Sequence, residues 1–183
     1  MIICISGMPC SGKDEFSKVL AAKGFKVLRM RDIIKEMMDD AGVSIDRESM
    51  RTFSTSLRKK YGDDIVARLM AKRIKSARMS KGIAICGIRG EPEVLALKKL
   101  LDDSFLSVWM ETRADIRFKR MMKRKRKDDP MDLKGFRKRE SIEKGWGIEN
   151  VRKHADVIIS NEGSLADLRK SALLLISRLN TNA

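Results

Sequence analysis

The chain has 183 residues and a formal net charge of +15, and 43% of its residues are hydrophobic. This length and this apolar content are typical of one globular domain and exclude an intrinsically disordered chain. The sequence has no apolar run of about 20 residues, the length that crosses a bilayer, and no signal peptide, so we expect a cytoplasmic protein without a membrane partner.

Five short apolar runs are long enough for strands and too short for helices. They are nearly continuous in apolar residues and have helical patterns between them. This arrangement predicts an α/β fold whose parallel sheet is covered on both faces. The predicted strands span Ile2–Ser6, Phe25–Leu28, Ile83–Gly87, Phe105–Met110 and Asp156–Ser160.

Capping residues predict where several helices begin. Asp46 precedes a predicted helix over residues 47–61, and Asp64 precedes one over residues 65–79. A third helix is expected at Glu91, where a proline follows in the first turn. Two further starts have the spacing of a capping box, namely Thr112 with Asp115 and Ser164 with Asp167.

One segment lacks a clear pattern. Residues 128–147 contain Pro130 and three glycines, which are typical of irregular backbone. We therefore expect a loop or a mobile flap here.

The first predicted strand leads directly into a glycine-rich loop and then into a helical pattern. This order is typical of a phosphate-binding loop, because glycines let backbone N–H groups surround a phosphate while a lysine reaches the outer phosphates of a nucleotide. Lys13 is the lysine that we expect in this role. The predicted loop consists of Gly7, Met8, Pro9, Cys10, Ser11, Gly12, Lys13 and Asp14.

Asp14 departs from the usual loop pattern. Serine or threonine normally follows the lysine and gives a hydroxyl to Mg²⁺. A carboxylate beside a polyphosphate is repelled unless a metal lies between them. Either Asp14 binds Mg²⁺ directly, or this protein uses the metal differently.

The sequence contains few of the cysteines and histidines that zinc sites and hydrolase triads require. Cys4, Cys10 and Cys86 have no CxxC spacing, and His154 is the only histidine. The sequence therefore predicts neither a structural zinc site nor a hydrolase triad.

The loop and several later segments resemble the nucleoside monophosphate kinase group. The closest resemblance is to an archaeal family of P-loop proteins related to adenylate kinase and dephospho-CoA kinase, and it extends over nearly the whole chain. The resemblance implies ATP and Mg²⁺ as cofactors and a three-layer fold with strand order 2-3-1-4-5. It also implies one domain over residues 1–183, with a helical acceptor-binding region at 31–79 and a short lid at 113–140.

The segment IAICGIRGEP, residues 83–92, resembles the third-strand element of these kinases. The resemblance assigns Arg89 to the acceptor phosphate. Cys86 stands where these kinases have an acidic residue that holds Mg²⁺ through water. Two interpretations stay open and are compatible: Asp14 supplies the missing charge from the loop, or Cys86 is simply a small buried strand residue.

The segment RADIRFKRMMKRKRKDDP, residues 113–130, resembles the lid of these kinases. Residues 113–139 carry 13 basic and four acidic side chains, so the excess positive charge is local. Guanidinium groups suit the charge that develops on a transferred phosphoryl group. An alternative is a basic patch for RNA or a membrane surface. The lid residues that match the pattern are Arg120, Arg124, Arg126, Asp128 and Asp129.

The remaining assignments also come from the resemblance. Either Arg137 or Arg139 returns to the phosphates. Trp146 lies between two glycines, and of its two possible roles, packing or a platform for a base, packing is favoured. Asn161, Gly163 and Ser164 border the nucleotide base. Together with Arg89, the candidates for acceptor binding are Arg31, Arg51 and Arg58.

These observations predict an ATP-binding kinase, with Lys13 and the lid arginines as catalytic residues. It would transfer the γ-phosphoryl group of ATP to a nucleotide-like acceptor, either a nucleoside monophosphate or dephospho-CoA. The alternative is a nucleotide-dependent RNA-binding or assembly protein with little or no ATPase activity.

Overall fold

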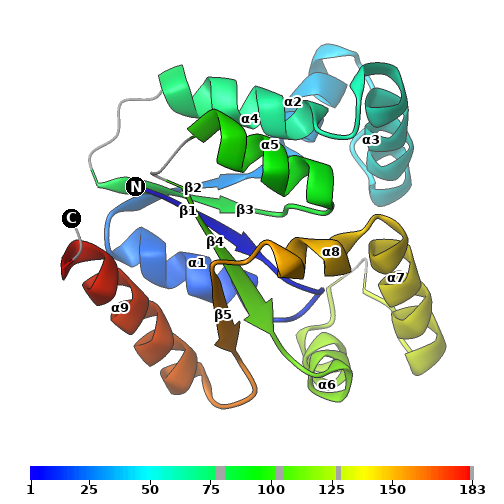
Figure 1. Ribbon diagram of the computed structural model, residues 1–183. Helices are drawn as coiled ribbons and strands as arrows, with labels where there is room; N and C mark the ends of the chain where they lie inside the picture. Colours follow the sequence, from blue (N-terminus) through cyan, green and yellow to red (C-terminus); the bar gives the residue numbers. More distant parts are fainter. Residues whose placement is uncertain (77–80, 102–104, 127–128, 182–183) are drawn as a thin grey trace.

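The structure is a computed structural model that describes residues 1–76, 81–101, 105–126 and 129–181 (Figure 1). Within these ranges, five parallel strands form one sheet in the order β2-β3-β1-β4-β5, which confirms the predicted class and strand order. β1 pairs with β3 on one side and with β4 on the other, so the loop after β1 lies at the centre of the sheet. The strands are β1 (Ile2–Ser6), β2 (Phe25–Arg29), β3 (Gly82–Cys86), β4 (Phe105–Glu111) and β5 (Val157–Ser160).

Helices cover both faces of the sheet (Figure 1). α1 and α9 lie on one face, and α2, α4, α5 and α8 lie on the other. α3, α6 and α7 lie near the carboxyl ends of the strands (Figure 1). The helices are α1 (Lys13–Ala22), α2 (Met30–Asp40), α3 (Arg47–Tyr61), α4 (Ile65–Ser76), α5 (Glu91–Leu101), α6 (Ala114–Arg124), α7 (Leu133–Gly145), α8 (Ile148–Lys153) and α9 (Leu165–Thr181).

Two hydrophobic cores hold these layers together. Ile3 and Ile5 of β1 point toward α1 and α9, whereas Ile2 and Cys4 point toward the helices on the opposite face. This alternation follows from the two-residue period of a strand, and it explains why the strands are apolar on both sides. In the part of the chain that the structure covers, no helix combines the length and the apolar character that a membrane span requires.

Two of the predicted helix starts are confirmed in detail. Asp46 caps α3 by accepting hydrogen bonds from the backbone N–H groups of Glu48 and Ser49, at 2.8 and 3.0 Å. Ser164 and Asp167 form the reciprocal capping box before α9. The predicted helix over residues 65–79 is α4; its expected last three residues lie outside the described ranges.

The prediction of a loop or flap over residues 128–147 is wrong, because α7 occupies most of it. The glycines and the proline lie at helix boundaries instead of in irregular backbone. Pro130 precedes the N-cap Asp132, whose carboxylate accepts a hydrogen bond from the N–H of Gly135 at 2.7 Å. Gly147, with a φ of 82°, then separates α7 from α8.

The predicted capping box of Thr112 and Asp115 is also wrong. The N-cap of α6 is Arg113, which makes no side-chain capping bond. The Thr112 hydroxyl instead lies within hydrogen-bonding distance of the carbonyl oxygens of Ser11, at 3.2 Å, and Asn161, at 3.1 Å. Tertiary contact with the glycine loop therefore overrides the local capping pattern.

Candidate active site

The glycine loop follows β1 and leads into α1 at the centre of the carboxyl-terminal edge of the sheet (Figure 1). Its backbone has positive φ angles at Gly7 (142°), Cys10 (64°) and Gly12 (99°). A hydrogen bond from Ser11 N to Met8 O, 3.1 Å, closes the turn. Such a turn ahead of a helix N-terminus is the backbone arrangement that binds phosphate groups.

Asn161 supports this loop from the end of β5. Its Nδ2 atom donates to Ser11 O at 2.8 Å, and its own N–H donates to Glu111 O at 2.9 Å. The resemblance assigned Asn161 to the border of the base, and the structure places its side chain against the glycine loop. Gly12 is the residue that makes room for it, because a Cβ on Gly12 would lie 2.1 Å from Asn161 Nδ2.

Replacing Gly12 by alanine is therefore expected to lower the free energy of unfolding by about 2–4 kcal/mol, through the overlap with Asn161 and the left-handed backbone. Gly42→Ala is the matched control, because Gly42 also has a positive φ (64°) but no atom within 4 Å of an added Cβ. Urea unfolding would compare the two variants. Equal losses would show that Asn161 does not restrict this position.

Lys13 lies in the first turn of α1 and reaches back into the loop. Its Nζ atom donates to Gly7 O at 2.6 Å and to Met8 O at 2.8 Å. Desolvation lowers the pKa of Lys13 to about 8, although the negative charges of Glu143 and Asp14 act in the opposite direction. The ammonium group thus lies within the turn that the sequence predicts to bind phosphate.

Asp14 is half exposed beside the loop and forms an ion pair with Arg126, with Oδ2 and Nη2 3.0 Å apart. Partial burial raises the pKa of Asp14, but the hydrogen bond and charge of Arg126 outweigh this effect and lower it. A carboxylate is the hard oxygen ligand that Mg²⁺ prefers, so Asp14 fits this ion. Cys86 does not, because burial raises the pKa of its thiol to about 11 and keeps it neutral.

Asp129 holds two arginines from different helices. Its carboxylate accepts two hydrogen bonds from Arg124, both 2.6 Å, and one from Arg139 Nη1 at 2.9 Å. The Asp129 side chain is 2% exposed. Burial raises its pKa, but the hydrogen bonds from Arg124 and Arg139, together with the charge of Arg124, lower it to about 2. Of the two arginines that the sequence left as alternatives, Arg139 is the one that joins this group.

Arg120 lies apart from these arginines. Its Nη2 atom donates to Gly163 O at 3.4 Å, in the turn between β5 and α9. Two residues assigned by resemblance to the border of the base, Gly163 and Ser164, are in this turn, so the structure brings Arg120 to them. Asp128, the other acidic lid residue, lies outside the described residues.

Sequence reasoning did not single out Arg117, which is buried between α6, α7 and the loop. Its guanidinium donates to Thr112 O at 2.9 Å, lies 3.5 Å from Pro9 O and forms an ion pair with Glu140. An arginine in the first turns of a basic helix gives no local signal of burial, so only the tertiary fold identifies this contact.

The predicted acceptor-binding arginines are partly engaged by carboxylates. Arg58 pairs with the buried Glu93 at 2.8 Å, and Glu93 also accepts a hydrogen bond from Arg89 N at 2.9 Å. Arg89 Nη1 donates to both carboxylate oxygens of Glu143 at 2.8 Å. Arg31 is exposed at the start of α2 and lies 3.9 Å from Asp32.

Arg51 lines a hollow of about 330 Å³ between α3 and α7. We call it the α3–α7 hollow. Trp146 on its wall is 38% exposed, and the Arg89 guanidinium lies 4.9 Å from the centroid of its ring. The lining residues are Arg51, Thr52, Thr55, Ser56, Ile142 and Trp146.

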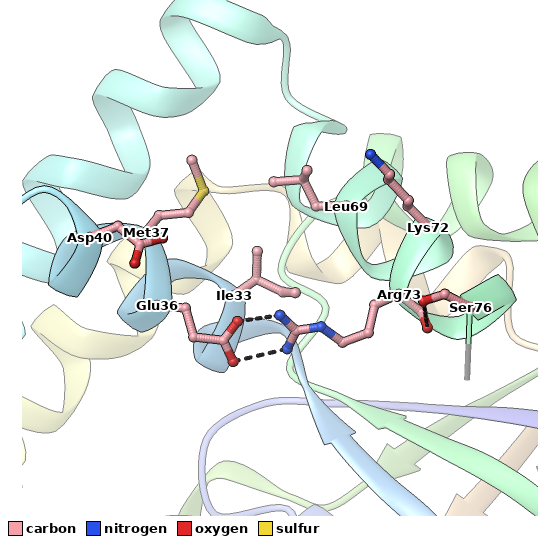
Figure 2. A pocket seen from close by; sticks show the side chains of 8 residues that line it. All are labelled: Ile33, Glu36, Met37, Asp40, Leu69, Lys72, Arg73 and Ser76. Carbon is pink, nitrogen blue, oxygen red and sulfur yellow. Dashed lines mark hydrogen bonds and ion pairs between the residues drawn. The ribbon is translucent and has the colours of Figure 1, made fainter. Parts of the chain in front are cut away.

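A second hollow, of about 390 Å³, lies between the later turns of α2 and α4 (Figure 2). Figure 2 shows Glu36 and Arg73 facing each other across it, joined by two hydrogen bonds. None of its lining residues belongs to the glycine loop or to α6 and α7. The candidate active site is therefore the region around the loop, Asp129 and the α3–α7 hollow.

Comparison with solved structures supports the architecture. TT1252 from Thermus thermophilus has a TM-score of 0.66 and 20% identity, with 98% of this chain and 97% of that chain covered. Shikimate kinase from Acinetobacter baumannii, solved in complex with shikimate, has a TM-score of 0.63 and 16% identity, with coverage of 99% and 93%. A gluconokinase from Sinorhizobium meliloti has a TM-score of 0.59 and 13% identity, with coverage of 98% and 93%. At these identities the likeness concerns the fold.

Comparison of sequences gives the family. A family profile described as an AAA domain matches residues 3–144. The UPF0200 protein of Thermococcus sibiricus is 33% identical to this chain, and the match covers 98% of this chain and 95% of that protein. The UPF0200 protein of Sulfurisphaera tokodaii is also 33% identical, and the match covers 97% of each chain. The UPF0200/UPF0201 protein of Archaeoglobus fulgidus is 29% identical over 99% of this chain, which spans 56% of that longer protein. The chain therefore belongs to the UPF0200 family and has a P-loop kinase-like fold, as the resemblance predicted.

Proposed function

We propose that this protein is an ATP-dependent kinase that transfers the γ-phosphoryl group of ATP to a small, nucleotide-like acceptor. The observation that carries the proposal is the contact between Arg126, beyond the end of α6, and Asp14 of the glycine loop. It brings the basic segment to the phosphate loop, where a kinase needs positive charge.

In this proposal, the loop and Lys13 hold the phosphates of ATP. Lys13 already lies within the turn, 2.6 Å from Gly7 O, and needs only to exchange carbonyl partners for phosphate oxygens. Asp14 would hold Mg²⁺, which neutralises negative charge on the β- and γ-phosphates when bound.

Arg124, Arg126 and Arg139 would stabilise the transferred phosphoryl group. Arg124 and Arg139 are fixed by Asp129, so their guanidinium groups are oriented before substrate arrives. The acceptor would occupy the α3–α7 hollow, which Arg51 lines and Arg89 borders through Trp146.

An RNA-binding or assembly protein is the alternative, and the excess of positive charge alone would favour it. The pairings of Arg124, Arg126 and Arg139 with aspartates argue against it, since these arginines face carboxylates of the site.

Stimulation of ADP release from Mg²⁺-ATP by a nucleoside monophosphate or dephospho-CoA would support the kinase. RNA binding that falls steeply with salt, without any such stimulation, would support the alternative.

Replacing Asp14 by alanine is expected to weaken the dependence of ATP affinity on Mg²⁺ by about tenfold or more, because a carboxylate ligand is lost. A titration of ATP binding at several Mg²⁺ concentrations would measure it. Glu15→Ala is the control, because Glu15 is the next residue and pairs with Lys18 on the surface of α1. Unchanged metal and ATP affinity in Asp14→Ala would remove its role as a ligand.

A further inference from the structure

Glu143 is a buried carboxylate of the candidate site and belongs to α7. Its side chain is 10% exposed and receives two hydrogen bonds of 2.8 Å from Arg89, which follows β3. Glu143 therefore lies at the same edge of the sheet as Cys86, whose buried thiol provides no negative charge.

Arg89 connects Glu143 to the α3–α7 hollow, because its guanidinium donates to the Glu143 carboxylate and lies 4.9 Å from the ring centroid of Trp146. Trp146 and Ile142, which lies next to Glu143 on α7, both line the hollow. The negative charge of Glu143 also acts on Lys13 of the glycine loop, where it is the largest influence that favours the charged ammonium. Glu143 therefore acts on the loop lysine and, through Arg89, on the wall of the hollow.

A carboxylate at this point is unfavourable for one class of acceptor and useful for another. A phosphate acceptor carries negative charge and would be repelled by Glu143, which also occupies the Arg89 guanidinium. An acceptor hydroxyl is neutral and must lose its proton during transfer, and a positioned carboxylate can accept that proton. Thr52 and Ser56 line the hollow, and side chains of this kind suit a neutral polar group, whereas the Thr55 hydroxyl already donates to Arg51 O at 2.9 Å.

We propose that Glu143 is the general base of this kinase and that the acceptor group is a hydroxyl. The inference rests on the proposed function. The acceptor oxygen attacks the γ-phosphorus of ATP, the bond from this phosphorus to the bridging oxygen breaks, and ADP leaves with the bonding electron pair. The hydroxyl proton passes to a carboxylate oxygen of Glu143, and the product is a phosphate monoester. Arg89 is a positioning residue, because it orients the carboxylate.

The test combines product chemistry with Glu143→Gln, which keeps the size of the side chain and removes the base. The purified protein is incubated with Mg²⁺-ATP and either nucleosides, dephospho-CoA or nucleoside monophosphates, and the new phosphorus resonance is identified by ³¹P NMR. We expect a phosphate monoester. In Glu143→Gln we expect kcat to fall about 10²–10⁴-fold, with KM for ATP unchanged. Glu149→Gln is the control, because Glu149 is exposed and pairs with Lys144.

A binding measurement tests the same idea without turnover. If Glu143 repels a phosphate group near Arg89, Glu143→Gln should bind AMP about tenfold more tightly than the wild type, and Glu149→Gln should not. ATP affinity and the midpoint of thermal unfolding check that each variant is folded. If Glu143→Gln does not fold, Glu143→Asp takes its place, and we expect a smaller loss of kcat because a carboxylate remains.

The outcomes separate the two proposals. A phosphoanhydride product, such as ADP from AMP, together with full activity in Glu143→Gln, would overturn the hydroxyl acceptor and leave the kinase function standing. Absence of phosphoryl transfer to every acceptor would overturn the proposed function, and this inference with it.

Discussion

Replacing Lys13 by methionine is expected to lower phosphoryl transfer from ATP by about 10³-fold or more. The substitution keeps the aliphatic stem of the side chain and removes the charge that lies within the glycine loop, 2.6 Å from Gly7 O and 2.8 Å from Met8 O. Loss of a single group that stabilises transition-state charge costs about 10²–10³-fold, and the loss of a full positive charge adds to this. Steady-state kinetics and ATP titration would measure the effect.

Lys18→Met is the matched control for this change. Lys18 lies on the same helix, is 70% exposed and pairs with Glu15, so its replacement should leave activity and stability almost unchanged. Full activity in Lys13→Met would contradict the assignment of the loop to the phosphates of ATP.

Replacing Asp129 by asparagine is expected to lower the free energy of unfolding by about 3 kcal/mol. The change leaves Arg124 and Arg139 facing each other without the buried carboxylate that both contact. Removal of one partner from a buried ion pair costs about 3–5 kcal/mol, and the partial exposure of the two arginines favours the lower end. Urea unfolding would measure the loss. Asp115→Asn is the control, because Asp115 on α6 is exposed and its pair with Arg113 is 3.5 Å long.

The stability that Asp129 provides also has a defined pH range. Its pKa is about 2 in the folded protein, below the ordinary value of 3.8, so the folded state favours the charged carboxylate. This stability is fully present above about pH 4 and is lost as the pH falls toward 2. Acid unfolding curves of the wild type and Asp129→Asn should therefore converge over this range. A constant difference down to pH 2 would show that the Asp129 charge is not the source of the stability.

The sheet and the glycine loop could be predicted from the sequence because their signals are local. The β1 run is apolar on both sides, and the pattern from Gly7 to Asp14 follows within the next eight residues. The strand order came from the resemblance, and the structure confirms it. α7 was missed because Gly135 and Pro130 are common in loops, and only the capping contact of Asp132 shows that they start a helix.

The contacts that organise the site connect residues far apart in the chain. Arg126 meets Asp14 across 112 positions, and Arg89 meets Glu143 across 54. Composition predicted that the basic segment serves an anion, but it could not distinguish an arginine that faces solvent from one held by an aspartate. The roles of Arg120, Arg124, Arg126 and the acceptor-binding arginines stay predictions, and the structure supplies the pairings from which they can be tested.

The most direct test of the account is transfer of labelled phosphate from [γ-³²P]ATP, with Mg²⁺, to a panel of nucleosides, nucleoside monophosphates and dephospho-CoA, with each product identified by mass. We expect a labelled product, heavier than one acceptor by a single phosphoryl group, and no such product with Lys13→Met. Release of labelled inorganic phosphate alone, at a rate that no acceptor changes, would contradict a kinase and favour a nucleotide-dependent binding protein.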